Sequence, residues 1–157
     1  MKLPFEGQCA CGEIRYRATA QPGFSWICHC RDCQRASGSA NCSIMYVPRD
    51  AMEIQGTARY YTVSAESGNQ VSRGFCATCG SPMFILADLV PDLHGVWASS
   101  LDEPAQFNPV VQVWCASGQP WGTLHPALNR IAKAPNPEEF AEILAASASS
   151  QTSAHSG

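Results

Sequence analysis

Seven of the nine cysteines in this chain stand in three short clusters, and their spacing constrains the fold more than any other feature of the sequence. The clusters are a C-x-C pair, a C-x-C-x-x-C triplet and a C-x-x-C pair, at Cys9 and Cys11, Cys28, Cys30 and Cys33, and Cys76 and Cys79. Reducing compartments rarely keep disulfides, so clustered thiols in an intracellular chain favour metal binding or catalysis. The sequence therefore predicts metal centres.

The composition limits the cellular setting and the partners. Neither an apolar stretch of signal-peptide length nor a run of about 18 apolar residues occurs, so we expect a soluble, cytoplasmic protein. Charged residues make up 15% of the chain, the formal net charge is -3, and there is no Lys/Arg run. These properties argue against nucleic acid or a membrane surface as a partner. With 157 residues, 45% of them hydrophobic, the chain can build one domain with a sizeable core.

The seven clustered thiols divide naturally into four and three. Structural zinc is closed by four protein ligands, whereas catalytic zinc has three and keeps one position open. The first pair and the last pair predict a closed zinc site that joins an N-terminal hairpin to a later strand, with the ligands Cys9, Cys11, Cys76 and Cys79. Gly12 and Gly80 follow these pairs directly and can relieve the tight turns that a zinc knuckle needs.

The middle triplet can bind a second zinc if the chain passes there from an extended segment into a helical turn. The sequence leaves the fourth ligand of this ion open between His29, Cys42, Cys115, a distant residue, and water or substrate. An extended backbone would turn His29 to the face opposite its neighbours, which argues against it as a ligand. Other interpretations are a purely structural second zinc, an iron–sulfur cluster, and buried cysteines without a metal.

Period-two alternation predicts a mainly β protein. Short stretches rich in β-branched or aromatic residues, bounded by Gly, Pro, Asn or Asp, predict strands at 13–19, 41–47, 58–64, 82–86, 95–99 and 110–116. No strand is followed by a helix long enough for a parallel crossover. We therefore expect short, mainly antiparallel strands and an all-β core.

One helix is clearly signalled near the C-terminus. Asn136 can cap it, Pro137 suits its first position, and Glu139 completes a capping box. The expected docking stripe consists of Phe140, Ile143 and Leu144. The final "SASSQTSAHSG" has nothing to bury and is expected to be a polar tail. The predicted organisation is a zinc-binding domain at 1–135 followed by the helix and tail at 136–157.

Five motifs together carry a family resemblance: "GQCACGEIRY", "CHCRDCQRASG", "SRGFCATCGSPMF", "SSLDEP" and a late "PW". Over about residues 5 to 125 the chain resembles the glutathione-dependent formaldehyde-activating enzymes, a family that includes centromere protein V. The resemblance implies a tent-like fold of β-sheets with two zinc ions. It also implies a structural ion held by Cys9, Cys11, Cys76 and Cys79, and a catalytic ion held by Cys28, Cys30 and Cys33.

The function implied by the resemblance is that of a zinc-dependent carbon–sulfur lyase or synthase, which joins glutathione to formaldehyde as S-(hydroxymethyl)glutathione. The alternative is a non-catalytic zinc-binding module or thiol-binding protein of the same fold. Among Arg31, Arg35, Arg59 and Arg73, the best candidates for a substrate carboxylate are Arg73 and Arg35, which lie inside matched motifs. Gln112 stands where the family commonly has a histidine, so any role of that histidine is absent or altered.

Overall fold

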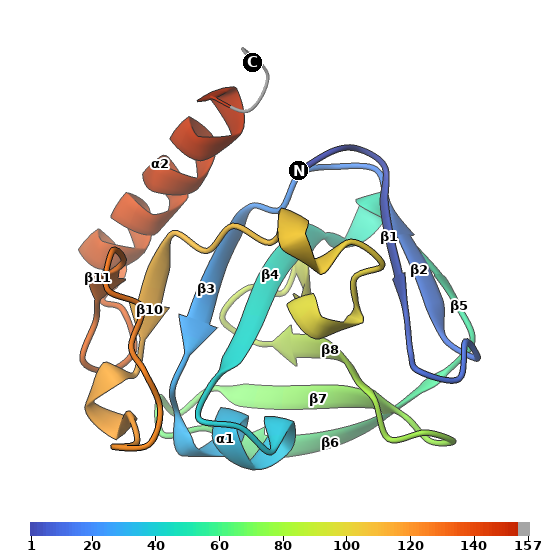
Figure 1. Cartoon of the computed structure of the whole chain (residues 1–157), viewed down its shortest axis with the longest axis horizontal. Helices are drawn as coiled ribbons and strands as arrows, with labels where there is room; N and C mark the ends of the chain where they lie inside the picture. Colours follow the sequence, from blue (N-terminus) through green and yellow to red (C-terminus); the bar gives the residue numbers. More distant parts are fainter. Residues whose placement is uncertain (154–157) are drawn as a thin grey trace.

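Two β-sheets make up most of the part of the chain that this computed structural model describes, residues 1–153 (Figure 1). The small sheet has the order β1-β2-β5, formed by Phe5–Gln8, Arg15–Ala18 and Met52–Gln55. The large sheet has the order β11-β10-β3-β4-β9-β8-β7-β6. Its strands in chain order are β3 (Phe24–Cys28), β4 (Cys42–Pro48), β6 (Ala58–Ser64), β7 (Gln70–Cys76), β8 (Pro82–Ala87), β9 (Leu93–Trp97), β10 (Val111–Val113) and β11 (Asn129–Arg130).

The strands are mainly antiparallel, as expected, with β10 as the exception. β10 pairs in parallel with β3 on one side and with β11 on the other. The sequence predicted no parallel pairs because no strand is followed by a crossover helix. The chain between the parallel strands β3 and β10 instead forms the strands β4 to β9. Residues far apart in the chain are thereby brought together beside the end of β3.

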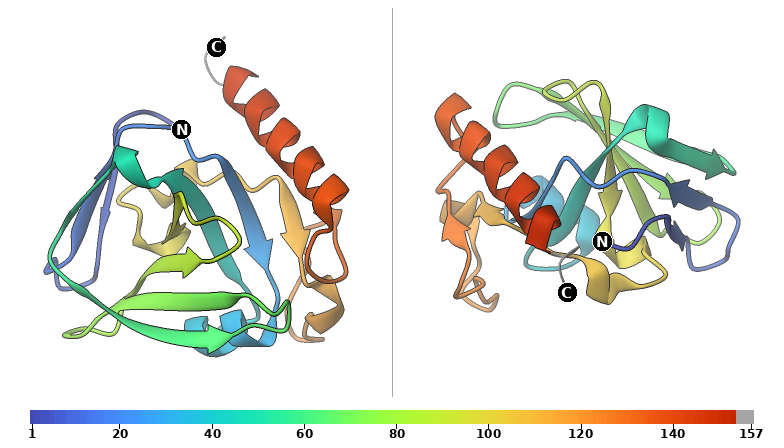
Figure 2. Two further views of the ribbon diagram at one scale, coloured as in Figure 1. Left: turned by 180° about the vertical axis from the view of Figure 1, so that it is seen from behind. Right: turned by 90° about the horizontal axis from the view of Figure 1, so that it is seen from above.

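The buried side chains divide into two clusters because β4 is covered on both faces. Met45 and Val47 belong to the cluster shared with the small sheet, whereas Ile44 and Tyr46 belong to a second cluster with β3 and the C-terminal helix. Successive side chains of a strand point to opposite faces, so this division follows directly from the sequence of β4. Figure 2 shows the small sheet and the helix on opposite sides of β3 and β4. The predicted mainly β fold with a C-terminal helix is confirmed.

Two α-helices accompany the sheets within residues 1–153. α1 spans Arg31–Ser37 and α2 spans Pro137–Ser153, and short 3-10 turns occur at Arg49–Ala51, Ala98–Ser100, Pro104–Gln106 and Cys115–Ser117. The predicted capping box of α2 is present, because the Glu139 N–H donates to Asn136 Oδ1 and the Asn136 N–H donates to Glu139 Oε2, both at 2.8 Å. Neither helix is long and apolar enough to cross a membrane.

α2 differs from expectation in its length and in its docking face. It continues to Ser153, across most of the stretch expected to be a tail; residues 154–157 lie outside the described residues. Ile143 is buried, but Leu144 is 41% exposed, so the prediction that Leu144 belongs to the docking stripe was wrong. Ser147 is buried in its place, and Gln151 Nε2 donates to the Pro22 carbonyl at 2.7 Å. The contact of Gln151 lies beyond the last apolar residue of the stripe, so the apolar pattern alone placed the end of the helix too early.

Two predicted strands end at least two residues earlier in the structure than expected. β9 ends at Trp97, where a 3-10 turn begins, rather than at residue 99. The stretch 110–116 is extended only over Val111–Val113, because Trp114 has the left-handed conformation with φ 59°. This conformation is uncommon for a non-glycine residue, and apolar alternation gives no sign of it. The division of the chain at residue 135 stays a prediction.

Candidate metal centres

The first and last cysteine pairs meet as a four-sulfur set. The Sγ atoms of Cys9, Cys11, Cys76 and Cys79 all lie within 4.8 Å of one another. Two of the separations are 3.5 Å, between Cys9 and Cys11, and 3.7 Å, between Cys11 and Cys76. Tetrahedral zinc with Zn–S bonds of about 2.3 Å requires sulfur atoms about 3.8 Å apart. The four thiols therefore fit a closed tetrahedral site.

Two glycines allow the turns that present these thiols. Gly12 and Gly80 both have φ +75°, a conformation that L side chains rarely adopt. The Gly12 N–H donates to the Cys9 carbonyl at 3.0 Å, and the Gly80 N–H donates to the Cys76 carbonyl at 2.9 Å. The paired turns support the expected zinc-knuckle geometry at the β1–β2 and β7–β8 connections.

Hydrogen bonds favour the thiolate at two members of the four-sulfur set, Cys9 and Cys79, whereas the neighbouring thiols raise the pKa of Cys11 to about 12. The Ser81 hydroxyl lies 3.2 Å from Cys79 Sγ, and this contact, with the Ser81 backbone, lowers the pKa of Cys79 to about 5. Burial acts to raise the pKa of Cys9. The Ile14 N–H, which donates to Cys9 Sγ at 3.2 Å, and the neighbouring thiols have the larger opposite effect, so the pKa is lowered. Thiolate is the form in which cysteine binds a metal.

The middle triplet forms a second, three-sulfur set. Cys28 ends β3, Cys30 is the N-cap of α1, and Cys33 lies in the first turn of that helix. Their Sγ atoms lie within 4.8 Å of one another, and the Cys33 N–H donates to Cys30 Sγ at 3.3 Å. The expected passage from an extended segment into a helical turn is thus present.

A buried polar network fixes the backbone between these ligands. Gln34 Nε2 donates to the carbonyls of His29, at 2.7 Å, and Ser117, at 2.9 Å. On the opposite side, His29 Nε2 lies 3.3 Å from Gln112 Oε1, which also accepts the His125 N–H at 2.7 Å. His29 therefore points away from the thiols, as expected from the extended backbone, and its burial lowers its pKa. Gln112 links the three-sulfur loop to the segment after β10.

Cys42 and Cys115 both lie outside the three-sulfur set. Cys42 is the cross-strand partner of Cys28, and its buried thiol contacts those of Cys28 and Cys33. Burial raises the pKa of Cys42 well above its usual value, which favours the protonated thiol. Cys115 Sγ instead donates to the Gln112 carbonyl at 3.6 Å.

A cavity of about 410 Å³ opens beside the three-sulfur set. Cys28, Cys30 and Cys33 all line it, whereas His29, Cys42 and Cys115 do not. Its volume lies within the range of small-molecule sites in proteins. A fourth ligand that enters from this cavity would therefore be a small molecule and not one of the three candidate residues.

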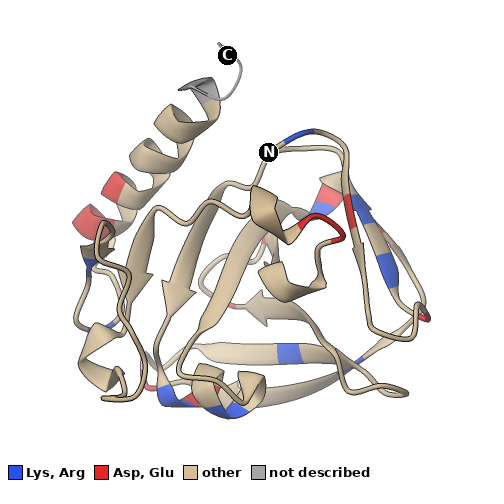
Figure 3. Ribbon diagram, viewed as in Figure 1, with Lys and Arg blue, Asp and Glu red and all other residues tan. Residues whose placement is uncertain are grey.

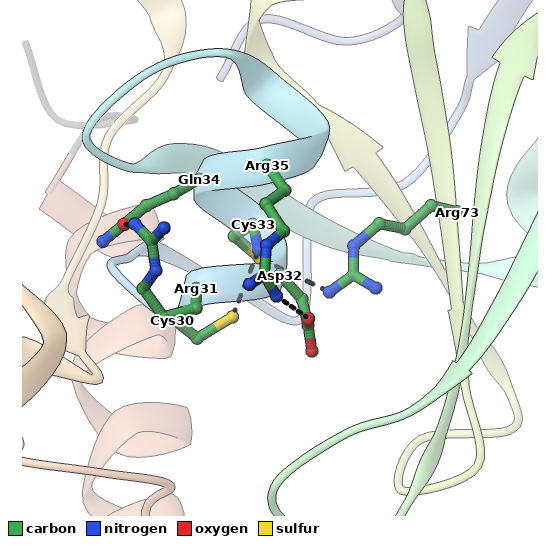
Figure 4. A network of polar contacts seen from close by, with 7 residues as sticks. All are labelled: Cys30, Arg31, Asp32, Cys33, Gln34, Arg35 and Arg73. Carbon is green, nitrogen blue, oxygen red and sulfur yellow. Dashed lines mark hydrogen bonds and ion pairs between the residues drawn. The ribbon is translucent and has the colours of Figure 1, made fainter.

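Of the two arginines predicted to contact substrate, one lines this cavity. Arg73, on β7, reaches across to α1, and its Nη2 lies 3.7 Å from Cys33 Sγ (Figure 4). Arg35 does not line the cavity; its side chain is 71% exposed and lies 3.7 Å from the Asp32 carboxylate. Arg31 lines the cavity but bonds to Gln34, and Arg59 is exposed on β6.

The position of Arg73 adds to an electrostatic bias toward the Cys33 thiolate. Hydrogen bonds with Cys28 and Cys30, then with Cys42, lower the pKa of Cys33 well below its usual value, and the Arg73 charge acts in the same direction against the effect of burial.

Other charged residues are scarce near the centre of the molecule. Figure 3 shows them on α1, the small sheet and the start of α2, while β3, β4 and β10 carry none.

Sequence reasoning missed several residues around the three-sulfur set. Gln34 is the residue after Cys33, but a glutamine in a short helix does not reveal which carbonyls it will bind. Trp26 and Trp114 line the cavity from β3 and from the turn after β10. Alternation with Cys28 could have placed Trp26 on the same face, whereas Trp114 depends on the parallel pairing of β3 and β10.

Comparison with known proteins agrees with this architecture. A family model described as glutathione-dependent formaldehyde-activating enzyme matches residues 4–117. A Halomonas elongata protein, provisionally named a glutathione-dependent formaldehyde-activating enzyme, is 26% identical over 102 residues, which are 62% of this chain and 65% of that protein. The match thus spans just under two thirds of that relative's length.

A solved structure supports the fold alone. The crystal structure of a Rhodobacter sphaeroides protein matches with a TM-score of 0.51 and 21% identity, over 66% of this chain and 91% of that chain. The family model, by contrast, covers well over half of the chain and includes both cysteine sets. The chain therefore belongs to the glutathione-dependent formaldehyde-activating enzyme family.

Proposed function

We propose that this chain binds two zinc ions and is a carbon–sulfur lyase or synthase acting on thiol–aldehyde adducts. The single observation that carries the proposal is the contrast between the two cysteine sets. Four thiols form a complete tetrahedral set, whereas the other three line a cavity of about 410 Å³. This is the difference between structural and catalytic zinc sites. The name of the Halomonas elongata relative suggests glutathione and formaldehyde as reactants.

In the proposed reaction, the cysteines, Gln34 and Arg73 would have different roles. Cys28, Cys30 and Cys33 would hold the ion, and the hydrogen bonds from Gln34 to two carbonyls keep their loop in place. Zinc with three thiolate ligands supplies a position at which an added thiol loses its proton. Arg73 places a cation beside Cys33 and offsets part of the negative charge that four sulfur atoms would bring.

The proposed reaction balances without any further reactant. A bond forms between the thiol sulfur and the carbonyl carbon of a small aldehyde, while the carbonyl π bond breaks. The proton from the thiol ends on the new hydroxyl oxygen. The reverse reaction returns thiol and aldehyde, so the same site would serve as lyase or synthase. No hydride or electron transfer is required.

Cobalt substitution tests the open position. In cobalt-loaded protein, glutathione should change the absorption bands of one site, because three-sulfur ligation becomes four-sulfur ligation. S-methylglutathione should have no effect, since it has no thiol to offer. The Cys30→Ser variant should lose the response, whereas Cys115→Ser, outside both sets, should keep it. An unchanged spectrum with every thiol tried would contradict the proposal.

A second candidate function is a non-catalytic zinc-binding module of the same fold. It is favoured by the contacts of the Cys42 thiol with Cys28 and Cys33, which would allow Cys42 to close the second site after a small rearrangement. In that case Cys42→Ser should open the site and create a thiol response that the unaltered protein lacks. If the site is already open, Cys42→Ser should leave the response unchanged. The cytoplasmic location stays a prediction.

A further inference from the structure

The cavity beside the three-sulfur set is built from one face of the large sheet. Phe24 and Trp26 precede Cys28 at alternate positions of β3, and Ile44 and Tyr46 lie opposite them on β4. Val71 of β7 and Ile85 of β8 continue the same wall. Since alternate residues of a strand share a face, the aromatic and aliphatic side chains form one wall of the cavity, and the thiols lie at the end of this wall. A molecule whose sulfur joins this set must lay its remaining atoms along that wall.

A glycine in β9 lies between two residues of this wall, Tyr46 and Ile85. Tyr46 and Ile85 both pair with Gly95 in neighbouring strands. A Cβ at Gly95 would lie 2.8 Å from Ile85 Cβ and 3.1 Å from Tyr46 Cε1. A side chain at Gly95 would therefore displace both the tyrosine and the isoleucine, which line the cavity.

Each charged side chain that lines the cavity has at least one partner in the protein. Asp32 lies 3.7 Å from Arg35, Glu66 lies 3.2 Å from Lys133, and Arg31 bonds to the Gln34 side chain. Arg73 is directed at Cys33. Two positive and two negative side chains balance one another, while zinc with three thiolates carries a net charge of about -1. A tripeptide with two carboxylates would meet no free cation there and a negative centre.

Two polar groups on the wall lack partners. Trp26 Nε1 and Arg73 Nε are buried and have no hydrogen-bond partner among residues 1–153. Both are N–H donors, so they fit an oxygen acceptor on the occupant. A buried donor without a partner is costly, and an occupant that supplies an acceptor removes this cost. An amine on the occupant would find no such complement in these two groups.

We infer that the thiol accepted at the three-sulfur set is an uncharged one with an aromatic or branched aliphatic body, rather than glutathione. The inference rests on the proposed function, because it assumes that a thiol enters the open position. The aromatic wall and the paired charges both favour this class, and the two unpartnered N–H groups leave room for an oxygen acceptor on it. The aldehyde partner must be small, since the body of the thiol would occupy much of the cavity.

Three probes separate the possible results: 2-phenylethanethiol, glutathione and 2-phenylethanol, which has the same body without a thiol. Binding to the metal-loaded full chain is followed by cobalt absorption and by tryptophan fluorescence, because Trp26 and Trp114 line the cavity. The dissociation constant of 2-phenylethanethiol should be at least about tenfold lower than that of glutathione, as burial of an aromatic ring predicts. The alcohol should alter fluorescence only weakly and leave the cobalt bands unchanged.

The outcomes that contradict the inference are distinct from those that contradict the proposed function. Tighter or equal binding of glutathione would overturn the inference while the proposed function stands. If neither thiol altered the cobalt spectrum, the open site itself would be wrong, and the inference would fall with it. A response to the alcohol as strong as to the thiol would show that the metal does not select sulfur, which also overturns the inference.

A pair of exposed leucines supplies matched variants. Leu89 lines the cavity and is 55% exposed, whereas Leu144 is 41% exposed on α2 and lies outside the cavity. Leu89→Arg should weaken 2-phenylethanethiol and strengthen glutathione, because it places a free cation at the cavity. Leu144→Arg should change neither. Equal effects of the two substitutions would contradict this placement of the thiol, and neither exposed site should impair folding.

Discussion

The Nη2 atom of Arg73 lies 3.7 Å from the Sγ atom of Cys33, although 40 positions separate the two residues in the chain. One residue belongs to the large sheet and the other to the first turn of α1. The contact joins these elements across the cavity, so the charge of the sheet residue acts directly on a candidate zinc ligand. It is the only such arginine contact to a cysteine sulfur shown among residues 1–153.

Removal of this cation should weaken metal binding at the three-sulfur set. Arg73→Met is expected to lower zinc affinity there about fivefold, which corresponds to about 1 kcal/mol for one partly buried charge pair. The measurement is a competitive titration with a zinc chelator. Arg59→Met is the matched control, because Arg59 is exposed on the neighbouring strand β6. Equal zinc affinity in Arg73→Met and the unaltered protein would argue against the electrostatic role.

The two cysteine sets should differ in what they contribute to stability. Cys79 is exposed, so Cys79→Ser removes a metal ligand with little change in packing. Because structural zinc contributes on the order of 10 kcal/mol, comparable to the whole stability of a domain, this variant should lose one zinc and most of its thermal stability. Cys115→Ser should keep two zincs by elemental analysis. Cys30→Ser should lose one zinc but melt closer to the unaltered protein; the reverse order would exchange the proposed roles.

Two glycines with the same backbone conformation allow strain and metal binding to be separated. Gly80 and Gly68 have φ +75° and +84°, and a Cβ at either position would meet no atom within 4 Å. Each substitution by alanine should therefore cost about 1 kcal/mol of stability from backbone strain alone. Only Gly80→Ala should also reduce zinc affinity, since its N–H holds the turn after Cys76. Unchanged zinc affinity in that variant would show that the turn geometry is not needed.

The stability of the fold should fall in mild acid partly because of His94. Burial, with the Arg49 charge nearby, lowers the pKa of His94 to about 4 from its usual 6.5. Between these values the unfolded chain binds a proton that the folded chain does not, so the contribution is complete above pH 6.5 and is lost as the pH falls toward 4. His94→Gln removes this proton linkage.

Urea unfolding of both proteins at pH 7 and pH 4.5 measures the effect. The loss of unfolding free energy between the two pH values should be smaller for His94→Gln. Release of metal in acid affects both proteins alike, so their difference isolates the histidine. If both lose the same amount, the low pKa of His94 is incorrect.

The docking of α2 should depend on one apolar residue of an adjacent pair. Ile143 is 3% exposed and belongs to the cluster around Phe24, whereas Leu144 is 41% exposed. Ile143→Ala should lower the free energy of unfolding by about 2–4 kcal/mol, as is typical of a buried large-to-small change. Leu144→Ala should change it by less than about 0.5 kcal/mol. Comparable losses in chemical denaturation would mean that the helix docks by both residues.

Short-range features of the sequence determined much of this protein. The spacing of the cysteines separated a four-ligand set from a three-ligand set, and the structure brings the same residues together. Asn136 and Glu139 predicted the start of α2 correctly, because a capping box involves only four consecutive residues. The run of apolar residues at 41–47 predicted the strand β4, which spans Cys42–Pro48. Each cysteine cluster and the capping box lies within a few consecutive residues, whereas the meeting of the first and last cysteine pairs depends on the fold.

The tertiary structure alone decided what surrounds the second cysteine set. The contact of Arg73 with Cys33, the parallel pairing of β3 with β10 and the bond of His29 to Gln112 each join distant segments. The sequence holds no local pattern that says which segments will meet, because strand order is set by the packing of whole sheets. The cavity exists only once those sheets have formed, and for that reason the class of thiol could be inferred only from the structure.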